Sequence, residues 1–239
     1  MLPGPVADYY ENLPESSQKS VNTAAEEIIT AKKAGGKVML VVGSGPNLHE
    51  GVTTLIAELM HKGIVDSVTT SSAVIAHEMG GTLDLVKRVP ASSLGIPEES
   101  HFLPKGAVFE FTVMDDKTLD RLRREMILDE ELLKKGQGVD GDVIIKAAGN
   151  MAYPFGLRTE NLSTEIMSLA QMLALPFETV AGWGADSRTM IGAGARTGKP
   201  VLVTVPQLVG GGNVGLSVAD SIPVSRRCSL IAQMIDEAD

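Results

Sequence analysis

Cysteine is nearly absent from this chain, and aromatic residues are few. One cysteine, Cys228, occurs among 239 residues, which excludes an intramolecular disulfide framework and a cysteine-rich zinc site. Aromatic residues make up 4% of the chain, whereas there are 25 glycines. This balance favours an α/β protein with tight strand-to-helix turns over an aromatic-rich β-sandwich. The lone cysteine also favours a reducing compartment.

Long apolar runs and an excess of basic residues are missing as well. No apolar run reaches the roughly 18 residues that a membrane-spanning helix needs, and residues 1–12 lack a signal-peptide pattern. Acidic residues outnumber basic ones by 30 to 21, giving a net charge of −9, so nucleic acids and anionic membranes are poor partners. We therefore expect a cytoplasmic protein that acts on a small molecule.

The first third of the chain has the element order of a parallel α/β unit. We expect an N-terminal helical segment over residues 1–36, because its apolar residues recur at helical spacing and Gly35-Gly36 stops them. Strands are predicted at 38–42 and 64–70, and helices at 52–61 and 72–79. The run at 38–42 is continuously apolar, which is typical of a strand buried on both faces of a parallel sheet. This order predicts a right-handed βαβ unit.

The remaining elements are less regular, and residues 80–160 are expected to form an excursion from a domain that spans 37–239. Strands are predicted at 107–113, 178–182 and 201–205, and helices at 118–135, 161–173, 186–195 and 225–239. Asp186 is a plausible N-cap of its helix. A parallel-sheet domain ordinarily continues with a strand after a helix, so we expect either a fragment or a fold without its last strands.

Two glycine-containing loops follow the predicted strands and are candidate ligand-binding loops. The first, Gly43-Ser44-Gly45-Pro46-Asn47, lets the backbone approach a ligand at a helix N-terminus, where unpaired N–H groups favour a phosphate. Its spacing is neither the Gly-x-Gly-x-x-Gly fingerprint nor a P-loop. The second, Gly210-Gly211-Gly212-Asn213, follows the strand at 201–205. Each loop has a competing interpretation, which is a tight turn for the first and a mobile lid for the second.

Small hydroxyl residues follow the second predicted strand. Thr69, Thr70, Ser71 and Ser72 lie where open α/β sheets bind ligands, and their hydroxyls can donate to phosphates or ribose. Plain helix capping by Ser71 or Ser72 explains the same residues equally well.

Histidines near these loops are the candidate catalytic residues. His49 follows the first glycine loop, and His77 with the adjacent Glu78 lies just past the hydroxyl cluster. None of the four histidines has the spacing of a helical metal site, so no metal is predicted. Cys228 lies within a predicted helix and no Gly-x-Ser-x-Gly elbow is present, which disfavours a cysteine or serine nucleophile.

The order of these motifs resembles deoxyhypusine synthase. The relevant segments are Ser44-Gly45-Pro46-Asn47-Leu48, then Val65-Asp66, then Val68-Thr69-Thr70, and later 198–215. The segment Ser72-Ala73-Val74-Ile75-Ala76-His77-Glu78 is more similar to a sister group, the archaeal NAD-dependent ornithine cyclodeaminases. The resemblance covers residues 37–79 and 186–239. It implies a Rossmann-like three-layer domain with a mostly parallel sheet, a homo-oligomer, and NAD bound between subunits.

The resemblance also implies oxidation of an amine to an imine, and here the sequence departs from the synthase. Where the synthase has Asp-Gly-Ser-x-Gly-Asp, this chain has Gly-Gly-Gly-Asn213-Val214-Gly215, and its imine-forming lysine has no counterpart. The base that removes a proton from the substrate amine would then be His77, ahead of His49 and Glu78. A non-catalytic nucleotide-binding or regulatory domain, and a scaffold that acts only by oligomerising, remain as alternatives.

Overall fold

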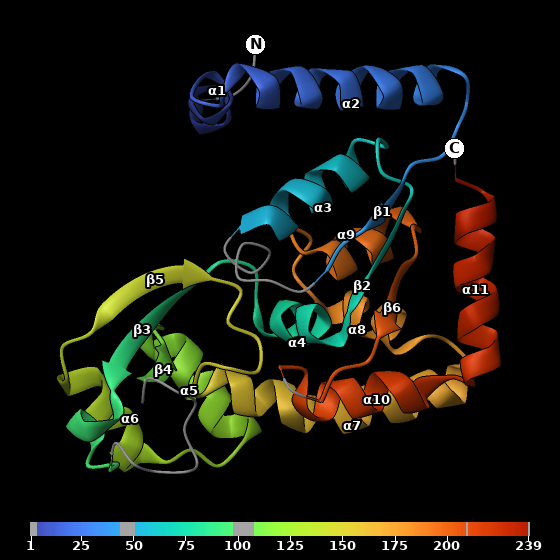
Figure 1. Ribbon diagram of the computed structural model, residues 1–239. Coiled ribbons are helices and arrows are strands. Elements are labelled where there is room, and N and C mark those ends of the chain that lie inside the picture. Colours follow the sequence, from blue (N-terminus) through green and yellow to red (C-terminus); the bar gives the residue numbers. More distant parts are fainter. Residues whose placement is uncertain (1–3, 44–50, 98–107, 209, 239) are drawn as a thin grey trace.

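The computed structural model describes residues 4–43, 51–97, 108–208 and 210–238, and it confirms an α/β architecture (Figure 1). Two separate three-stranded sheets are present in this part of the chain, a parallel one of order β1-β2-β6 and an antiparallel one of order β4-β3-β5. The strands are β1 Met39–Val41, β2 Ser67–Ser71, β3 Asp84–Pro90, β4 Val108–Thr112, β5 Asp142–Lys146 and β6 Val201–Val205.

Helices make up most of the remaining described residues. Their bounds are α1 Gly4–Glu11, α2 Glu15–Lys33, α3 Thr53–His61, α4 Ser72–Gly80, α5 Asp116–Glu125, α6 Glu130–Gly138, α7 Phe155–Leu173, α8 Phe177–Gly184, α9 Met190–Thr197, α10 Gly212–Ser221 and α11 Val224–Asp236, with a short 3-10 helix at Ala91–Leu94. No helix among the described residues is both long and apolar enough to cross a membrane.

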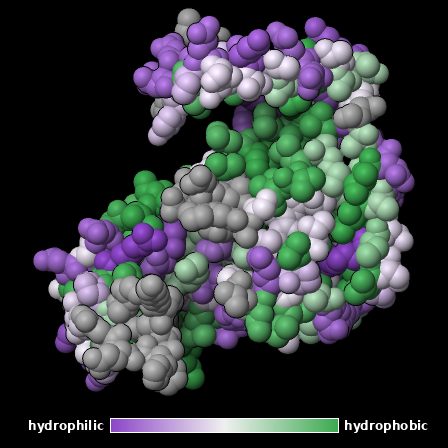
Figure 2. Space-filling view, in the orientation of Figure 1, coloured by the Kyte–Doolittle hydropathy of each residue, from purple (hydrophilic) through white to green (hydrophobic). Residues whose placement is uncertain are grey.

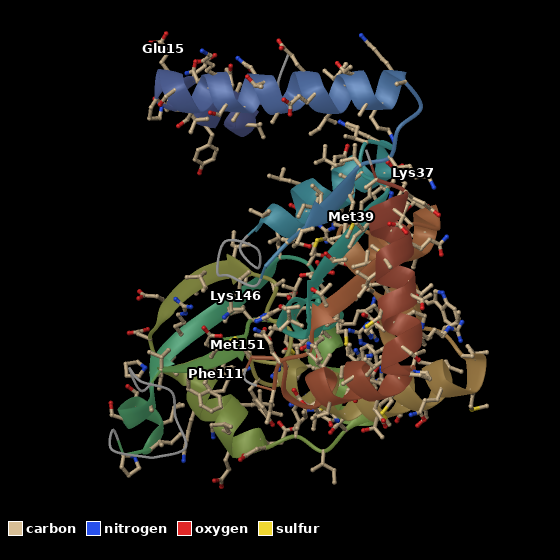
Figure 3. The ribbon with its side chains drawn as sticks, turned by 45° about the vertical axis from the view of Figure 1, so that its right-hand side comes forward. Glu15, Lys37, Met39, Phe111, Lys146 and Met151 are labelled. Carbon is tan, nitrogen blue, oxygen red and sulfur yellow. The ribbon has the colours of Figure 1, made fainter. Side chains whose placement is uncertain are left out.

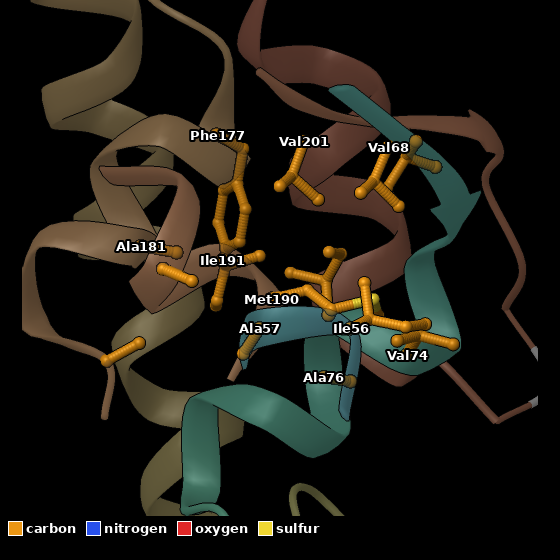
Figure 4. Close-up of a cluster of buried hydrophobic side chains, with 14 of the residues drawn as sticks. Ile56, Ala57, Val68, Val74, Ala76, Phe177, Ala181, Met190, Ile191 and Val201 are labelled. Atoms are coloured by element: carbon orange, nitrogen blue, oxygen red, sulfur yellow. The ribbon is translucent and has the colours of Figure 1, made fainter. Parts of the chain in front are cut away.

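One face of the parallel sheet carries the main hydrophobic core. The register pairs Leu40 with Val68 and Val68 with Val201, so these side chains share one face because side chains alternate along a strand. They pack against buried residues of α3, α4, α8, α9 and α10, among which Phe177 and Ile191 are fully buried (Figure 4). The chain order β1-α3-β2, with β1 and β2 parallel neighbours, agrees with the expected βαβ order.

The first strand is not buried on both faces as its sequence predicts. β1 pairs only with β2, and the Val41 side chain is 80% exposed. A continuous apolar run identifies the strand correctly but does not distinguish a central strand from an edge strand. β2 is the strand that is buried throughout.

The middle of the chain forms the antiparallel sheet together with α5 and α6. Phe111 of β4 lies against Gly136 of α6, where a Cβ atom would overlap the ring. The buried Lys146 ammonium donates to Glu110 at 2.6 Å, and Arg88 donates to the other oxygen of the same carboxylate at 2.9 Å. Figure 3 shows Phe111 and Lys146 within this unit. The strand predicted at 107–113 therefore belongs to a sheet separate from the parallel one.

The single long helix predicted at 118–135 is wrong, because the segment folds as two capped helices. The Asp115 carboxylate accepts from the Thr118 N–H at 2.8 Å and begins α5, and the Asp129 carboxylate accepts from the Leu132 N–H at 2.9 Å and begins α6. An aspartate side chain competes for backbone N–H groups and starts a new helix where the pattern alone continues the old one.

The short strand predicted at 178–182 is also wrong, since these residues lie in α8. Pro176 precedes the helix with extended backbone angles, and Glu178 stands in its first turn, where a carboxylate is favourable. The predicted N-cap Asp186 is replaced by Thr189, whose hydroxyl accepts from the Gly192 N–H at 3.0 Å. Asp186 instead pairs with Arg188 at 2.8 Å, which holds the pKa of its carboxyl well below the usual range.

A hairpin of α1 and α2 precedes the sheets and stands apart from them (Figure 1). The helical segment expected over residues 1–36 consists of two helices, α1 and α2, and α2 ends before Gly35. The root of the hairpin is fixed to the body: the Lys32 ammonium pairs with Asp66 at 2.7 Å, and Lys37 pairs with Glu237 of the C-terminal segment at 2.6 Å. Figure 3 shows Lys37 at this junction.

Candidate functional site

The loops that follow β2 and β6 are joined at the carboxyl edge of the parallel sheet. The Ser72 hydroxyl accepts from the Gln207 N–H at 2.6 Å and donates to the Gln207 carbonyl at 3.2 Å. Gly211 packs so closely on the Gln207 carbonyl that a Cβ atom would overlap it. The hydroxyl cluster and the glycine triplet expected to share a site therefore lie side by side.

Two buried hydroxyls at the end of β2 have no hydrogen-bond partner within the part of the chain that the structure describes. The Thr70 and Ser71 side chains are 2% and 4% exposed, and their oxygen atoms are unpartnered. Ser71 occupies the N-cap position of α4, yet its side chain makes no capping hydrogen bond. Capping thus does not account for Ser71. A buried unpaired hydroxyl costs about 1–3 kcal/mol, so a ligand that pairs with it would bind more tightly for that reason.

The helix N-termini near this edge differ in whether a side chain accepts hydrogen bonds from their first N–H groups. α3 and α4 begin without a side-chain cap and without an acidic residue in the first turn. α10 begins at the glycine triplet, and there the Glu160 carboxylate of α7 accepts from the Asn213 N–H at 2.7 Å. α4 therefore begins without a carboxylate, whereas Glu160 already binds the start of α10 and the Glu78 carboxylate binds the hydroxyl of Thr53, the first residue of α3.

Glu160 changes the interpretation of the glycine triplet as a loop that cradles a phosphate. Gly212 has a φ of 55°, in the left-handed region, and a Cβ atom there would overlap the Glu160 carboxylate. The same carboxylate accepts from the Asn150 side-chain amide at 3.1 Å. The glycines of this loop allow Glu160 of α7 to approach closely. The charged group at this loop is therefore the Glu160 carboxylate.

The loop after β5 brings His77 to the same region. Gly149, with a φ of 51°, lies directly against the His77 backbone, and Nδ1 of His77 lies 2.8 Å from the Ala147 carbonyl. Because a carbonyl only accepts, this bond places the proton on Nδ1 and leaves Nε2 as the basic nitrogen. His77 is 3% exposed. Oδ1 of Asn150, the residue next to Gly149, is buried and unpartnered.

Glu78 is buried in the core and bound to groups of the protein, which argues against it as a candidate base. Its oxygens accept from the Thr53 hydroxyl and from the N–H groups of Met190 and Ile191 at 3.2 and 3.0 Å. It therefore satisfies the N-terminus of α9 from within α4. Burial raises the pKa of Glu78 to about 7, against the lowering effect of these three hydrogen bonds.

The pKa of Glu78 predicts a pH dependence of stability. In the folded protein the Glu78 carboxyl keeps its proton up to about pH 7. An ordinary glutamate, with a pKa of 4.5, loses its proton at a lower pH. We expect the Glu78 contribution to the unfolding free energy to fall by roughly 3 kcal/mol as the pH rises from about 4.5 to 7. Urea titrations of wild type and Glu78→Gln at several pH values measure it.

Glu58→Gln is the matched control, because Glu58 is an exposed carboxylate on α3 and its removal should keep the wild-type pH slope. A Glu78→Gln protein whose stability follows the same pH profile as the wild type would contradict the assignment to Glu78.

The other predicted site residues are placed as follows. Gly43 is exposed at the end of the segment containing β1, and Ser44, Gly45, Asn47 and His49 lie outside the described residues. Thr69 is buried in β2. Among the described residues, no three or more histidine, cysteine or acidic side chains are grouped so that they could hold a metal ion.

A cavity of about 540 Å³ lies at the opposite, amino end of β2 and β6, lined by Ser67, Leu202 and Met234 among others.

Two residues of this site were missed by the sequence reasoning. Glu160 lies within α7, about 50 residues from the loop it contacts, and no local pattern indicates that contact. Asn150 follows Gly149 just after a strand, which is a signal of the kind used for the other loops. No protein-family model matches this chain, and no curated protein matches it.

Proposed function

We propose that this chain binds NAD at the carboxyl edge of the parallel sheet and uses it to oxidise an amino or hydroxy compound. The observation that carries the proposal is the pair of buried, unpartnered hydroxyls of Thr70 and Ser71 beside the uncapped N-terminus of α4. Hydroxyls and free N–H groups at this position favour a phosphorylated ligand. The motif order that resembles deoxyhypusine synthase and the ornithine cyclodeaminases supports NAD within a Rossmann-like domain.

Glu160 supports the choice of NAD over NADP. A carboxylate beside a dinucleotide site accepts hydrogen bonds from ribose hydroxyls and repels a 2′-phosphate. Asn150 offers a further acceptor oxygen next to it. In this proposal the N-terminus of α4 receives the phosphates, and Glu160 with Asn150 receives a ribose.

The proposed chemistry needs a base as well as the cofactor. NAD, when bound, supplies the acceptor for a hydride. Before hydride leaves a carbon that bears an amine, the ammonium must lose a proton, and Nε2 of His77 would accept it. We include a cytoplasmic location in the proposal, because the exposed thiol of Cys228 suits a reducing compartment.

A non-catalytic nucleotide-binding domain is the second candidate function. It is favoured by the burial of His77, which is 3% exposed, and by the lack of a lysine in the position expected from the synthase. The two candidates differ in one measurement. An enzyme forms NADH when ornithine, lysine or a polyamine is added, whereas a binding domain retains NAD affinity and forms none.

The cofactor site is tested by removing both unpartnered hydroxyls in Thr70→Val/Ser71→Ala. If they pair only with the ligand, their loss should raise the unfolding free energy of the free protein by about 1 kcal/mol. It should also raise the Kd for NAD more than tenfold, since each hydrogen bond to a charged group contributes about 1.5–3 kcal/mol and about 1.4 kcal/mol corresponds to a factor of ten. Urea denaturation and titration calorimetry measure the two effects, which have opposite signs.

Thr112→Val provides the control for this test, because Thr112 also carries a buried unpartnered hydroxyl but belongs to the antiparallel sheet. It should gain stability and leave NAD affinity unchanged. Equal NAD affinity in the wild type and in a folded Thr70→Val/Ser71→Ala protein would remove these hydroxyls from the site.

A further inference from the structure

The N-terminal hairpin has apolar side chains but no core of its own. α2 is 19 residues long and none of its residues is buried. Apolar side chains of the hairpin are exposed at Val6, Tyr9, Leu13, Val21 and Ile29. Hydrogen bonds from the Gln18 amide to the carbonyls of Tyr10 and Leu13 hold α1 against α2. Most of the stability of a helix in a protein comes from packing of its apolar face, so the hairpin is expected to need a surface to pack on.

The body also carries exposed apolar side chains, at β1 and α3. Val41 of β1 is exposed, and so are Val52 and Leu55 at α3. Figure 2 shows hydrophobic side chains on the body below the hairpin, separated from it by open space. The ion pair between Lys32 and Asp66 fixes the root of α2, and Asp66 also accepts from the Val38 N–H at 2.8 Å. This anchor fixes the point at which the hairpin joins the body.

We propose that the hairpin is an exchanged arm that packs on the α3 and β1 surface of a second copy of this chain. Each copy carries both the arm and the surface, so a two-fold arrangement satisfies both surfaces in both copies. The inference does not depend on the proposed function.

The size of the arm supports a second copy as its occupant. A helix of 19 residues is about 28 Å long and about 10 Å across, so it covers roughly 300 Å² on each partner. Two exchanged arms therefore bury on the order of 1,200 Å² in total, which is the lower limit for a stable interface. This area excludes α1, which adds to it.

Charge also allows the arm to pack on a like chain. The chain as a whole has a net charge of −9, which opposes association of two copies. α2, however, is balanced, with three acidic and three basic residues in its sequence ESSQKSVNTAAEEIITAKK. Its apolar stripe, which runs through Val21, Ala25 and Ile29 at spacings of four residues, is uncharged. The stripe can therefore contact an acidic partner without bringing charges of the same sign together.

The oligomeric state of arm variants tests the proposal. Sedimentation of the wild type should show a dimer at micromolar concentration, and Val21→Asp/Ile29→Asp should raise its dissociation constant at least tenfold. Thermal unfolding of the variant monomer should be unchanged, because neither side chain is buried within one chain. Thr23→Asp is the control, since Thr23 lies on the opposite side of α2 and should leave the dimer intact. A wild-type monomer, or a dimer that Val21→Asp/Ile29→Asp leaves unaltered, would overturn the exchanged arm.

Crosslinking distinguishes an exchanged arm from an arm that folds back. In a Cys228→Ser background, Ile29→Cys/Leu55→Cys should be joined between chains by a bis-maleimide and migrate as a covalent dimer. A crosslink confined to one chain would show that the arm packs on its own body. A dimer without any crosslink between these positions would place the interface elsewhere. Either result contradicts the proposal.

Discussion

Replacing Arg227 with methionine is expected to lower the unfolding free energy by about 3–5 kcal/mol, the usual cost of leaving one member of a buried ion pair without its partner. Arg227 of α11 is buried and pairs with Glu178 of α8, which is 1% exposed. Methionine fills much of the same volume but leaves the Glu178 carboxylate in the core without its counter-charge. Chemical denaturation of the two proteins measures the difference.

This pair is expected to be sensitive because it closes the free edge of β6. The Glu178 carboxylate accepts from the Val203 N–H at 2.6 Å, and the Arg227 guanidinium donates to the Val203 and Val218 carbonyls at 3.3 and 2.9 Å. The two side chains thus satisfy backbone groups that a neighbouring strand would otherwise bind. Loss of Arg227 leaves the Glu178 carboxylate without its counter-charge and removes a donor from both carbonyls.

Arg226→Met is the matched control, because Arg226 is the adjacent residue of the same helix and its side chain is exposed. Its effect should stay within about 0.5 kcal/mol, as for most surface substitutions. If Arg227→Met and Arg226→Met had equal stabilities, the buried pair would not be what holds α11 to the sheet.

Local signals in the sequence predict the elements whose causes are local. The strand at 201–205 and the helices that became α2, α3 and α4 follow from apolar pattern and from glycine or proline near their ends. The break before α6 also has a local cause, because the Asp129 side chain caps the new helix. The prediction missed this break because the helical spacing of the residues continues across it. β1 is at an edge because no strand of the described residues pairs on its other side, which is a property of topology and not of the run itself.

The residues of the candidate site also divide into those that the sequence predicts and those that only the fold brings there. Residues at strand ends, such as Ser72 and Gly211, are adjacent because parallel strands end at one edge of a sheet, and the sequence predicts this. Glu160 reaches the glycine loop from the middle of a helix, through a contact set by how α7 packs on α10. The glycine loop is thus bound by a carboxylate from elsewhere in the chain. Only the folded arrangement of α7 shows this.

Exchanging His77 for asparagine is expected to lower the turnover of an amino substrate by about 100-fold, within the usual range for loss of a general base. Asparagine retains a side-chain N–H that can donate to the Ala147 carbonyl in place of Nδ1, so the packing against Gly149 should persist. It has no basic nitrogen in place of Nε2. Imidazole ordinarily takes up a proton between pH 5 and 8, and an amide does not.

NADH formation with ornithine, lysine and polyamines measures this effect, alongside the Kd for NAD and the unfolding free energy. The Kd should be nearly unchanged, because His77 is assigned to the substrate's proton and not to the cofactor. His61→Asn is the control: His61 is exposed at the end of α3, its Nε2 contacts the Ser187 carbonyl at 2.8 Å, and its loss should leave turnover intact. If His77→Asn lowers stability while turnover stays at the wild-type rate, the imidazole serves only to hold the loop after β5, and the base must be sought elsewhere.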